Sequence, residues 1–125
     1  MKCTRCKIPA VVALPSHHAA FCRDCFLLFA RRLVERAIEE HQMFTAEDRI
    51  LVAISGGKDS LALSWQLKEL GYNIAGLHID LGIPESSPIA RQYSERFCAT
   101  RGIPLHVLDM AAEGLAMCEV KRRAR

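Results

Sequence analysis

Hydrophobic and polar positions divide the chain beyond about residue 48 into short apolar runs and longer amphipathic stretches. Residues 50–54 (ILVAI) are uninterrupted apolar, which predicts a strand buried on both faces of a sheet. Residues 73–79 and 104–108 predict two further strands, and helical spacing fills the intervals 59–70 and 87–101. Strands that alternate with helices through short connections predict a parallel, doubly wound α/β sheet.

Turn and cap residues support these boundaries. Gly71 and Gly102 each follow a helical stretch, at the position where a helix end favours glycine. Ser87 precedes Pro88, which predicts a helix cap followed by a proline in the first turn. His78 lies within the second strand and is expected to be packed or at a strand edge. Asp80 follows that strand, either as a turn residue or as a group that assists a bound metal or base.

The first part of the chain has a different pattern. Residues 1–20 contain Pro9 and Pro15 and predict no regular structure. Residues 21–43 repeat apolar side chains at three- and four-residue steps and predict one helix, with arginine and glutamate on its other face. Residues 44–48 are expected to connect this helix to the first strand.

Composition narrows the class of protein. A chain of 125 residues allows one ordinary domain, or a small domain with an appended module. Half of the residues are hydrophobic, which excludes a disordered chain. The net charge of +3 is too small to prove a nucleic-acid partner. Basic residues cluster at 31–36 and 121–125, but such runs are most often solvated faces.

Six cysteines, in a chain without an apparent membrane span or signal peptide, are expected to lie in the reducing cytoplasm. Two pairs, Cys3-x2-Cys6 and Cys22-x2-Cys25, have the spacing of a structural zinc site in which four thiolates surround one ion. Redox cysteines or a disulfide between the pairs are the alternative. That alternative is typical of a CxxC that follows a strand, and we expect no strand before either pair.

The stretch 54–60 (ISGGKDS) lies between the first predicted strand and the helix that follows it. Gly56 and Gly57 let the backbone turn tightly and bring its N–H groups close to an anion, and the helix adds its positive end. Lys58 supplies a positive charge. A carboxylate at Asp59 would repel phosphate unless a divalent cation lies between them, so Asp59 indicates Mg²⁺. A tight turn in which Asp59 caps the helix is the alternative.

Together, the cysteine pairs, the linking helix, RILVAISGGKDSLAL and GLHIDLGI resemble the PP-loop tRNA 2-thiolation enzymes, members of the N-type ATP pyrophosphatases. The resemblance covers essentially the whole chain. It implies an adenine nucleotide alpha-hydrolase-like (Rossmann-like) parallel sheet, preceded by a zinc-knuckle module. The implied organisation is a zinc-binding module at 1–30, a linking helix at 21–43 and a PP-loop ATP-binding α/β domain at 48–125.

The resemblance also implies roles for single positions. Zinc would be held by the four cysteines at 3, 6, 22 and 25. ATP would be bound by Ala53, Ser55, Gly56, Gly57, Lys58, Asp59, Ser60 and Ile79. Asp59 would act in catalysis through Mg²⁺.

In such enzymes the C2 oxygen of a tRNA pyrimidine attacks the α-phosphate of ATP, pyrophosphate leaves, and sulfur then displaces the adenylated oxygen. The implied partners are therefore tRNA and a sulfur donor. The family pattern also includes a CxxC and a distant third cysteine that commonly hold an iron–sulfur cluster. This sequence has no third CxxC, so a [4Fe-4S] cluster is expected only in a missing C-terminal part.

Three predicted strands are fewer than the five or so that the resemblance implies, so the sheet is expected to be incomplete. The first strand would then expose an apolar edge to water or to another chain. Either the sequence is the N-terminal part of a longer enzyme, which we favour, or a short protein completes its sheet by pairing as a homodimer. A PP-loop ligase with another acceptor and a non-catalytic zinc- and nucleotide-binding module remain alternative functions.

Overall fold

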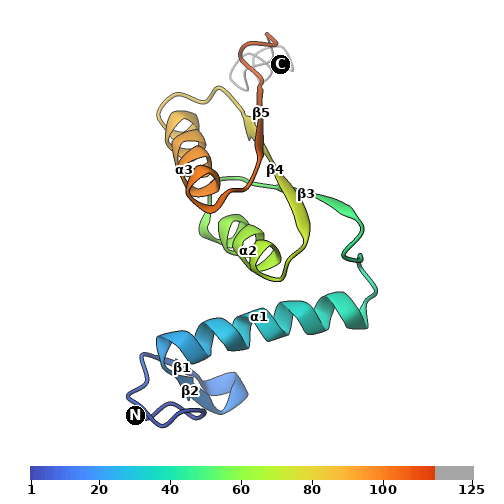
Figure 1. Ribbon diagram of the computed structural model, residues 1–125. Coiled ribbons are helices and arrows are strands. Elements are labelled where there is room, and N and C mark those ends of the chain that lie inside the picture. Colours follow the sequence, from blue (N-terminus) through green and yellow to red (C-terminus); the bar gives the residue numbers. More distant parts are fainter. Residues whose placement is uncertain (115–125) are drawn as a thin grey trace. The chain divides into compact units, whose positions relative to one another are not determined.

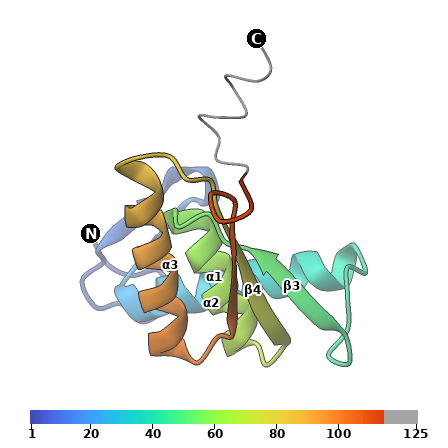
Figure 2. The same ribbon diagram turned by 90° about the horizontal axis from the view of Figure 1, so that it is seen from above.

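The computed structural model describes residues 1–114, and its contacts divide the chain into two compact units, Met1–Phe44 and Thr45–Arg125. The basic residues at 121–125 lie outside the described residues, so the expectations placed on them are not addressed. Figures 1 and 2 show the two units, and each is described here by itself. Within residues 1–114, no helix combines the length and the apolar character needed to cross a membrane.

The first unit begins with a small hairpin. Strands β1 (Val12–Leu14) and β2 (Ala19–Phe21) pair antiparallel, and a 3-10 turn, η1 (Pro15–His17), joins them. The helix α1 (Arg23–Glu40) follows directly. The prediction that residues 1–20 lack regular structure was therefore wrong. Strands of three residues are too short to show a period, but Pro15 starts the turn and His18 closes it in the left-handed region with φ 49°.

The core of the first unit is small and contains two of the cysteines. Cys3, Phe21 and Cys22 are buried, and half-buried apolar side chains from the hairpin and α1 pack against them. The ring of Phe29 on α1 stacks on Phe21 with 4.9 Å between centroids. So few apolar side chains bury little surface, and a unit of this size usually needs a metal or another cross-link to hold it together.

The second unit is a three-stranded parallel sheet with two crossover helices. In chain order these elements are β3 (Arg49–Ala53), α2 (Lys58–Glu69), β4 (Asn73–Asp80), α3 (Ser86–Arg101) and β5 (Leu105–Asp109). The strand order is β3-β4-β5, with Ala53 opposite Leu77 and Asp80 opposite Asp109. The predicted α/β class and parallel sheet are confirmed.

Both helices lie on the same face of this sheet, as the two views show (Figures 1 and 2). On the covered face Val52 and Ile54 are buried, whereas Leu51 on the other face is 59% exposed. The prediction of a doubly wound sheet with β3 buried on both faces was therefore wrong for the described residues. The order of the strands across the sheet is the same as their order along the chain. Each right-handed crossover therefore places its helix on the same side of the sheet.

The helix ends follow the predicted signals with one exception. Gly71 and Gly102, each with positive φ, follow α2 and α3 as expected. Ser87 is not the cap of α3, because the helix begins at Ser86 after Glu85. The Oγ of Ser87 instead accepts a hydrogen bond from the Ile83 amide, with 2.9 Å between the atoms. This bond ties the β4–α3 connection to the first turn of the helix.

Candidate metal centre and nucleotide site

The four paired cysteines converge in the first unit. Their Sγ atoms all lie within 4.8 Å of one another, and those of Cys6 and Cys22 are 3.6 Å apart. A tetrahedral thiolate site with metal–sulfur bonds of about 2.3 Å would place its sulfur atoms about 3.8 Å apart. The sequence predicted this grouping from spacing alone, and the donor set fits one soft, tetrahedral metal ion.

Local backbone bonds hold the cysteines in place. The amide of Cys3 donates to the Ile8 carbonyl at 2.7 Å, and the Lys7 amide donates to the Cys3 carbonyl at 3.0 Å, which closes the first knuckle. The Thr4 amide bonds the Ala20 carbonyl at 2.7 Å and joins the knuckle to β2. Cys22 is the N-cap of α1, so the second pair starts a helix.

The ionisation of these thiols shows why a cation belongs among them. Burial alone would raise the pKa of Cys3, but the backbone N–H groups of Cys6, Cys22 and Arg5 outweigh it and lower the pKa to about 6. Hydrogen bonding to the Cys22 sulfur, burial and the other thiols raise the pKa of Cys25 to about 12. Four thiols this close cannot all ionise unless a positive ion balances them.

One argument against redox chemistry was wrong. We expected no strand before either cysteine pair, yet β2 ends at Phe21, immediately before Cys22. The convergence of all four sulfur atoms replaces that argument, because a redox CxxC needs only its own two thiols. All four of these cysteines are free thiols. The cluster is therefore a metal-binding site.

The loop between β3 and α2 closes on its own hydroxyl groups. The amide of Ser55 donates to Ser60 Oγ at 3.2 Å, and the Gly57 amide donates to Ser55 Oγ at 3.2 Å. Ser60 Oγ in turn donates to the Gly57 carbonyl at 3.1 Å. Both predicted hydroxyls thus lie inside the loop, at the start of α2, where the first-turn N–H groups have no helical partner.

Gly56 sits where only glycine fits. Its φ is +97°, and a Cβ built on it would lie 2.8 Å from the carbonyl oxygen of Ala90 in α3. A side chain here would meet both backbone strain and a collision with backbone. The loop therefore packs directly on α3, and this contact sets its path.

Lys58 and Asp59 project from the start of α2 into solvent. Their side chains are 92% and 95% exposed, and Lys58 Nζ lies 3.8 Å from Asp59 Oδ1. Exposure to this degree means that neither charge is buried. Both groups are thus free to reorient toward a phosphate and its cation at the positive end of the helix.

The remaining predicted nucleotide residues meet at one hollow of about 320 Å³ beside the loop. Ala53, Ser55 and Ile79 line it together with Ile54, Leu77 and Leu81. The hollow lies at the carboxyl ends of β3 and β4, on the sheet face that the helices leave uncovered. Its lining is almost entirely apolar and suits the flat face of a base, and open α/β sheets bind ligands at this end.

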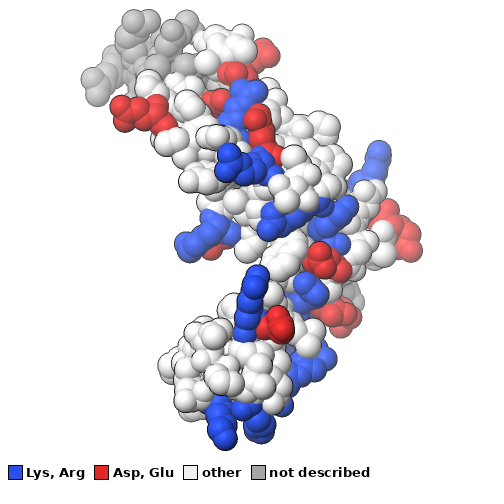
Figure 3. All heavy atoms as spheres, turned by 60° about the vertical axis from the view of Figure 1, so that its left-hand side comes forward, with Lys and Arg blue, Asp and Glu red and all other residues white. Residues whose placement is uncertain are grey.

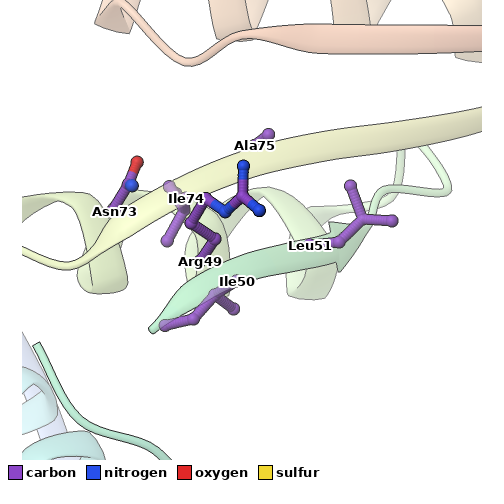
Figure 4. A pocket seen from close by; sticks show the side chains of 6 residues that line it. All are labelled: Arg49, Ile50, Leu51, Asn73, Ile74 and Ala75. Atoms are coloured by element: carbon purple, nitrogen blue, oxygen red, sulfur yellow. The ribbon is translucent and has the colours of Figure 1, made fainter. Parts of the chain in front are cut away.

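A second hollow, of about 230 Å³, lies at the opposite end of the same strands. Figure 4 shows the side chains that line it, among them the polar ones of Arg49 and Asn73. Because it lies near the amino ends of β3 and β4, far along the strands from the loop, it is not the site for a nucleotide held by the loop.

Sequence reasoning missed an ion-pair network at the ends of β4 and β5. Arg91 of α3 lies 3.3 Å from Asp80 and 3.2 Å from Asp109, and also pairs with Glu95 at 2.9 Å. The Gly82 amide bonds the carboxylate of Asp80 and lowers its pKa, burial opposes this, and Arg91 lowers it further. The signal was present, because parallel strands bring Asp80 and Asp109 to the same sheet edge.

Charge is distributed unevenly over the two units. Residues 1–44 contain seven Lys or Arg and four Asp or Glu, and residues 45–125 contain ten of each. Figure 3 accordingly shows mostly basic groups among the charged side chains on the visible face of the cysteine unit, and a mixture of signs on the second unit. The cysteine unit therefore offers the more positive surface to a polyanion.

These features define a class: an α/β nucleotide-binding protein with a cysteine metal module before its sheet. Comparison with known families agrees. The profile described as "2-thiouridine synthetase TtuA, N-terminal LIM domain" matches residues 2–27, and the PP-loop domain profile matches residues 30–125. The chain belongs to the PP-loop domain family. The resemblance drawn from the two motifs is thereby confirmed.

Two curated relatives match almost the whole chain. The tRNA-5-methyluridine(54) 2-sulfurtransferase of Pyrococcus horikoshii is 40% identical over 124 residues, which cover 98% of this chain and 40% of the relative. The enzyme of the same name from Thermus thermophilus is 42% identical over 123 residues, covering 98% of this chain and 38% of the relative. The chain thus spans about two fifths of the length of these relatives.

A solved structure shares the fold. The U34-tRNA thiolase NcsA from Methanococcus maripaludis, determined with its [4Fe-4S] cluster, superposes with a TM-score of 0.78 at 23% identity. The match covers 87% of this chain and 38% of that one. At this identity the likeness supports the α/β fold and carries no further conclusion about ligands.

Proposed function

We propose that the chain is the zinc- and ATP-binding part of an ATP-dependent tRNA 2-sulfurtransferase. The observation that carries this proposal is the pairing of a four-cysteine module with a PP-loop sheet, in an order that matches tRNA sulfurtransferases over 98% of the chain. A PP-loop ligase with a different acceptor is a weaker reading, because the thiolation-type N-terminal module matches residues 2–27.

In the proposed reaction the loop binds the triphosphate of ATP, and the C2 oxygen of a tRNA pyrimidine attacks the α-phosphate. The chain contributes position and charge: the N–H groups at the start of α2, the hydroxyls of Ser55 and Ser60, and Lys58 would hold the phosphates. Asp59 would bind the Mg²⁺ that accompanies them. Ala53 and Ile79 would contact the base in the apolar hollow beside the loop.

Several parts of the proposal rest on chemistry rather than on the fold. Zinc is the metal that four thiolates at this spacing favour. A tRNA substrate implies a cytoplasmic protein, and the basic surface of residues 1–34 would contact tRNA phosphates in a salt-dependent manner. The sulfur donor, and an iron–sulfur cluster outside this chain, belong to the second half-reaction. The unpaired edge of β3 is the place where a homodimer or further strands would join.

Titration calorimetry with ATP and Mg²⁺ tests the first half of the proposal. The wild-type chain is expected to bind ATP only with Mg²⁺ present, and Asp59→Ala to lose that dependence and most of the affinity. Asp24 offers a matched control, because it is the second residue of α1 as Asp59 is of α2. Asp24→Ala should bind ATP like wild type. Absence of ATP binding at saturating Mg²⁺ would end the proposal.

ATP–pyrophosphate exchange separates an enzyme from a binding module. Exchange that requires tRNA supports adenylation of tRNA, whereas ATP binding without exchange supports a non-catalytic role of this chain. The open edge of β3 favours binding without turnover for the 125-residue chain alone. Metal analysis completes the test: one zinc per chain is expected, and iron with visible sulfur-to-iron absorption would contradict the zinc assignment.

A further inference from the structure

His78 lies at the centre of the sheet, directly behind the loop. It occupies β4, is 3% exposed, and borders a cavity of about 140 Å³ that Ser55 and Ala90 also line. Its Nδ1 lies 2.7 Å from the carbonyl oxygen of Ile54. Strand β3 ends at Ala53, so this carbonyl is the last backbone acceptor before the chain turns into the loop.

The surroundings of Nδ1 fix the tautomer of the ring. The Ile54 carbonyl can only accept a hydrogen bond. Ser94 Oγ, 3.4 Å from Nδ1, already donates its own proton to the Ala90 carbonyl at 2.8 Å. Both neighbours of Nδ1 therefore act as acceptors toward it, and Nδ1 must carry the proton. The imidazole then donates to Ile54, and Nε2 is left as an acceptor.

Nε2 has no partner among the residues that the structure describes, although it is completely buried. A buried polar atom without a partner is costly, and an aliphatic side chain in this position would avoid that cost. A histidine here is therefore favoured by what its other nitrogen does. The hydrogen bond from Nδ1 to the Ile54 carbonyl offsets the cost of leaving Nε2 without a partner.

The same contacts connect His78 to the other side of the loop. Ala90, which accepts the hydroxyl of Ser94, is also the residue against which Gly56 packs. The loop is therefore held at its base, where His78 bonds the Ile54 carbonyl, and at its bend, where α3 supports Gly56. Ser94 lies between these supports and provides neither of them, since the bond to Ile54 comes from His78 and the contact with Gly56 from Ala90.

We propose that His78 is a positioning residue for the PP-loop: through Nδ1–H it fixes the Ile54 carbonyl and so sets the geometry in which the loop receives phosphate. His78 does not touch the nucleotide in this proposal. The proposal rests on ATP binding by the loop, but its structural half holds for the ligand-free protein and can be tested without ATP.

Two amide variants separate the two ring nitrogens. An asparagine amide can take the place of Nδ1, so His78→Asn retains the donor to Ile54 and loses Nε2. A glutamine amide reaches the place of Nε2, so His78→Gln loses the donor to Ile54. Ser94→Ala is the control, since it leaves the bond between Nδ1 and the Ile54 carbonyl intact.

Hydrogen exchange of the ligand-free chain is the first measurement. The amides of Ser55 and Gly57 are bonded to hydroxyls within the loop and report on its order. We expect His78→Gln to speed their exchange at least tenfold, and His78→Asn and Ser94→Ala to stay within threefold of wild type. In calorimetry with ATP and Mg²⁺, we expect the same ranking, with at least tenfold weaker binding only for His78→Gln.

Equal effects of the glutamine and asparagine variants on the loop would overturn the proposal, because only the asparagine amide keeps a donor beside the Ile54 carbonyl. If the wild type fails to bind ATP while loop exchange still ranks as expected, the proposed function falls and the positioning role stands. Nitrogen-15 NMR spectra of the His78 imidazole test the tautomer in the wild-type protein, without any variant. They should show the Nδ1-protonated tautomer, and the Nε2-protonated form would refute the assignment.

Discussion

The two units of the chain are held together by different means. In the cysteine unit, two of the four clustered thiols are themselves buried core residues, and few apolar side chains surround them. In the sheet unit, strand pairing and one covered sheet face provide the core, and the residues proposed to bind phosphate lie on an exposed loop. We therefore expect metal binding and folding to be coupled in the first unit, whereas in the second unit the proposed site can change without loss of the fold.

The two sites should therefore differ in how well the fold tolerates mutation of their residues. A ligand that is also a core residue cannot be replaced without cost to the structure. A loop whose charged groups point into solvent, as Lys58 and Asp59 do, can lose its charge and keep its sheet.

Removal of the metal should give the largest effect. Structural zinc contributes roughly 10–16 kcal/mol in small zinc-finger peptides, more than the whole stability of a small domain. We expect a strong chelator, or Cys22→Ser, to unfold residues 1–44 and to leave the sheet unit folded, as followed by amide NMR spectra. Cys98→Ala, in the other unit, is the control and should retain the metal. Unfolding of both units together would break the contrast.

Side chains on the two faces of the sheet, in β3 and directly after it, should respond very differently to truncation. Ile54 is 2% exposed on the covered side, whereas Leu51 is 59% exposed on the other. Ile54→Ala should cost about 2–5 kcal/mol of unfolding free energy, because it opens a cavity. Leu51→Ala should stay within about 0.5 kcal/mol. Urea unfolding measures both, and a large effect at Leu51 would show that the open face is covered in solution.

Replacing Gly56 in the loop should destabilise the fold in two ways, through steric collision and through backbone strain. Gly56 and Gly71 both have positive φ, but a Cβ on Gly71 would meet nothing within 4 Å. Gly71→Ala therefore pays strain alone, about 1–2 kcal/mol. Gly56→Ala adds the collision with Ala90 and should cost roughly 2–4 kcal/mol and abolish ATP binding. Thermal unfolding and calorimetry compare the two, and equal losses would mean that the loop does not depend on α3.

The smallest effect concerns acid stability. The bond from the Gly82 amide, together with Arg91, lowers the pKa of Asp80 below its value in the unfolded chain. This carboxylate therefore stabilises the fold fully above the unfolded pKa of about 3.9, and the contribution is lost as the pH falls through the lower folded pKa. Urea unfolding at pH 6 and pH 3 should show a smaller acid loss for Asp80→Asn than for wild type. An identical acid loss would assign the pH dependence to other groups.

Sequence reasoning worked where chemistry is local. The spacing of Cys3, Cys6, Cys22 and Cys25 predicted their convergence, because two short knuckles can reach one ion from opposite sides whatever the rest of the chain does. The apolar runs predicted the three parallel strands, and positive φ after each helix followed from Gly71 and Gly102. It failed for the hairpin at residues 12–21, whose strands are too short to carry a period.

By itself, then, the sequence determined the order of elements in the sheet unit, the grouping of the four cysteines and the loop proposed to bind phosphate, since each is marked by a short local motif. Tertiary structure alone decided which face of β3 is buried, because the order of the strands across the sheet determines which face the crossover helices cover. It also decided the role of His78. A histidine in a strand is only a packed side chain until the fold brings the Ile54 carbonyl, 24 positions away, within 2.7 Å of its ring.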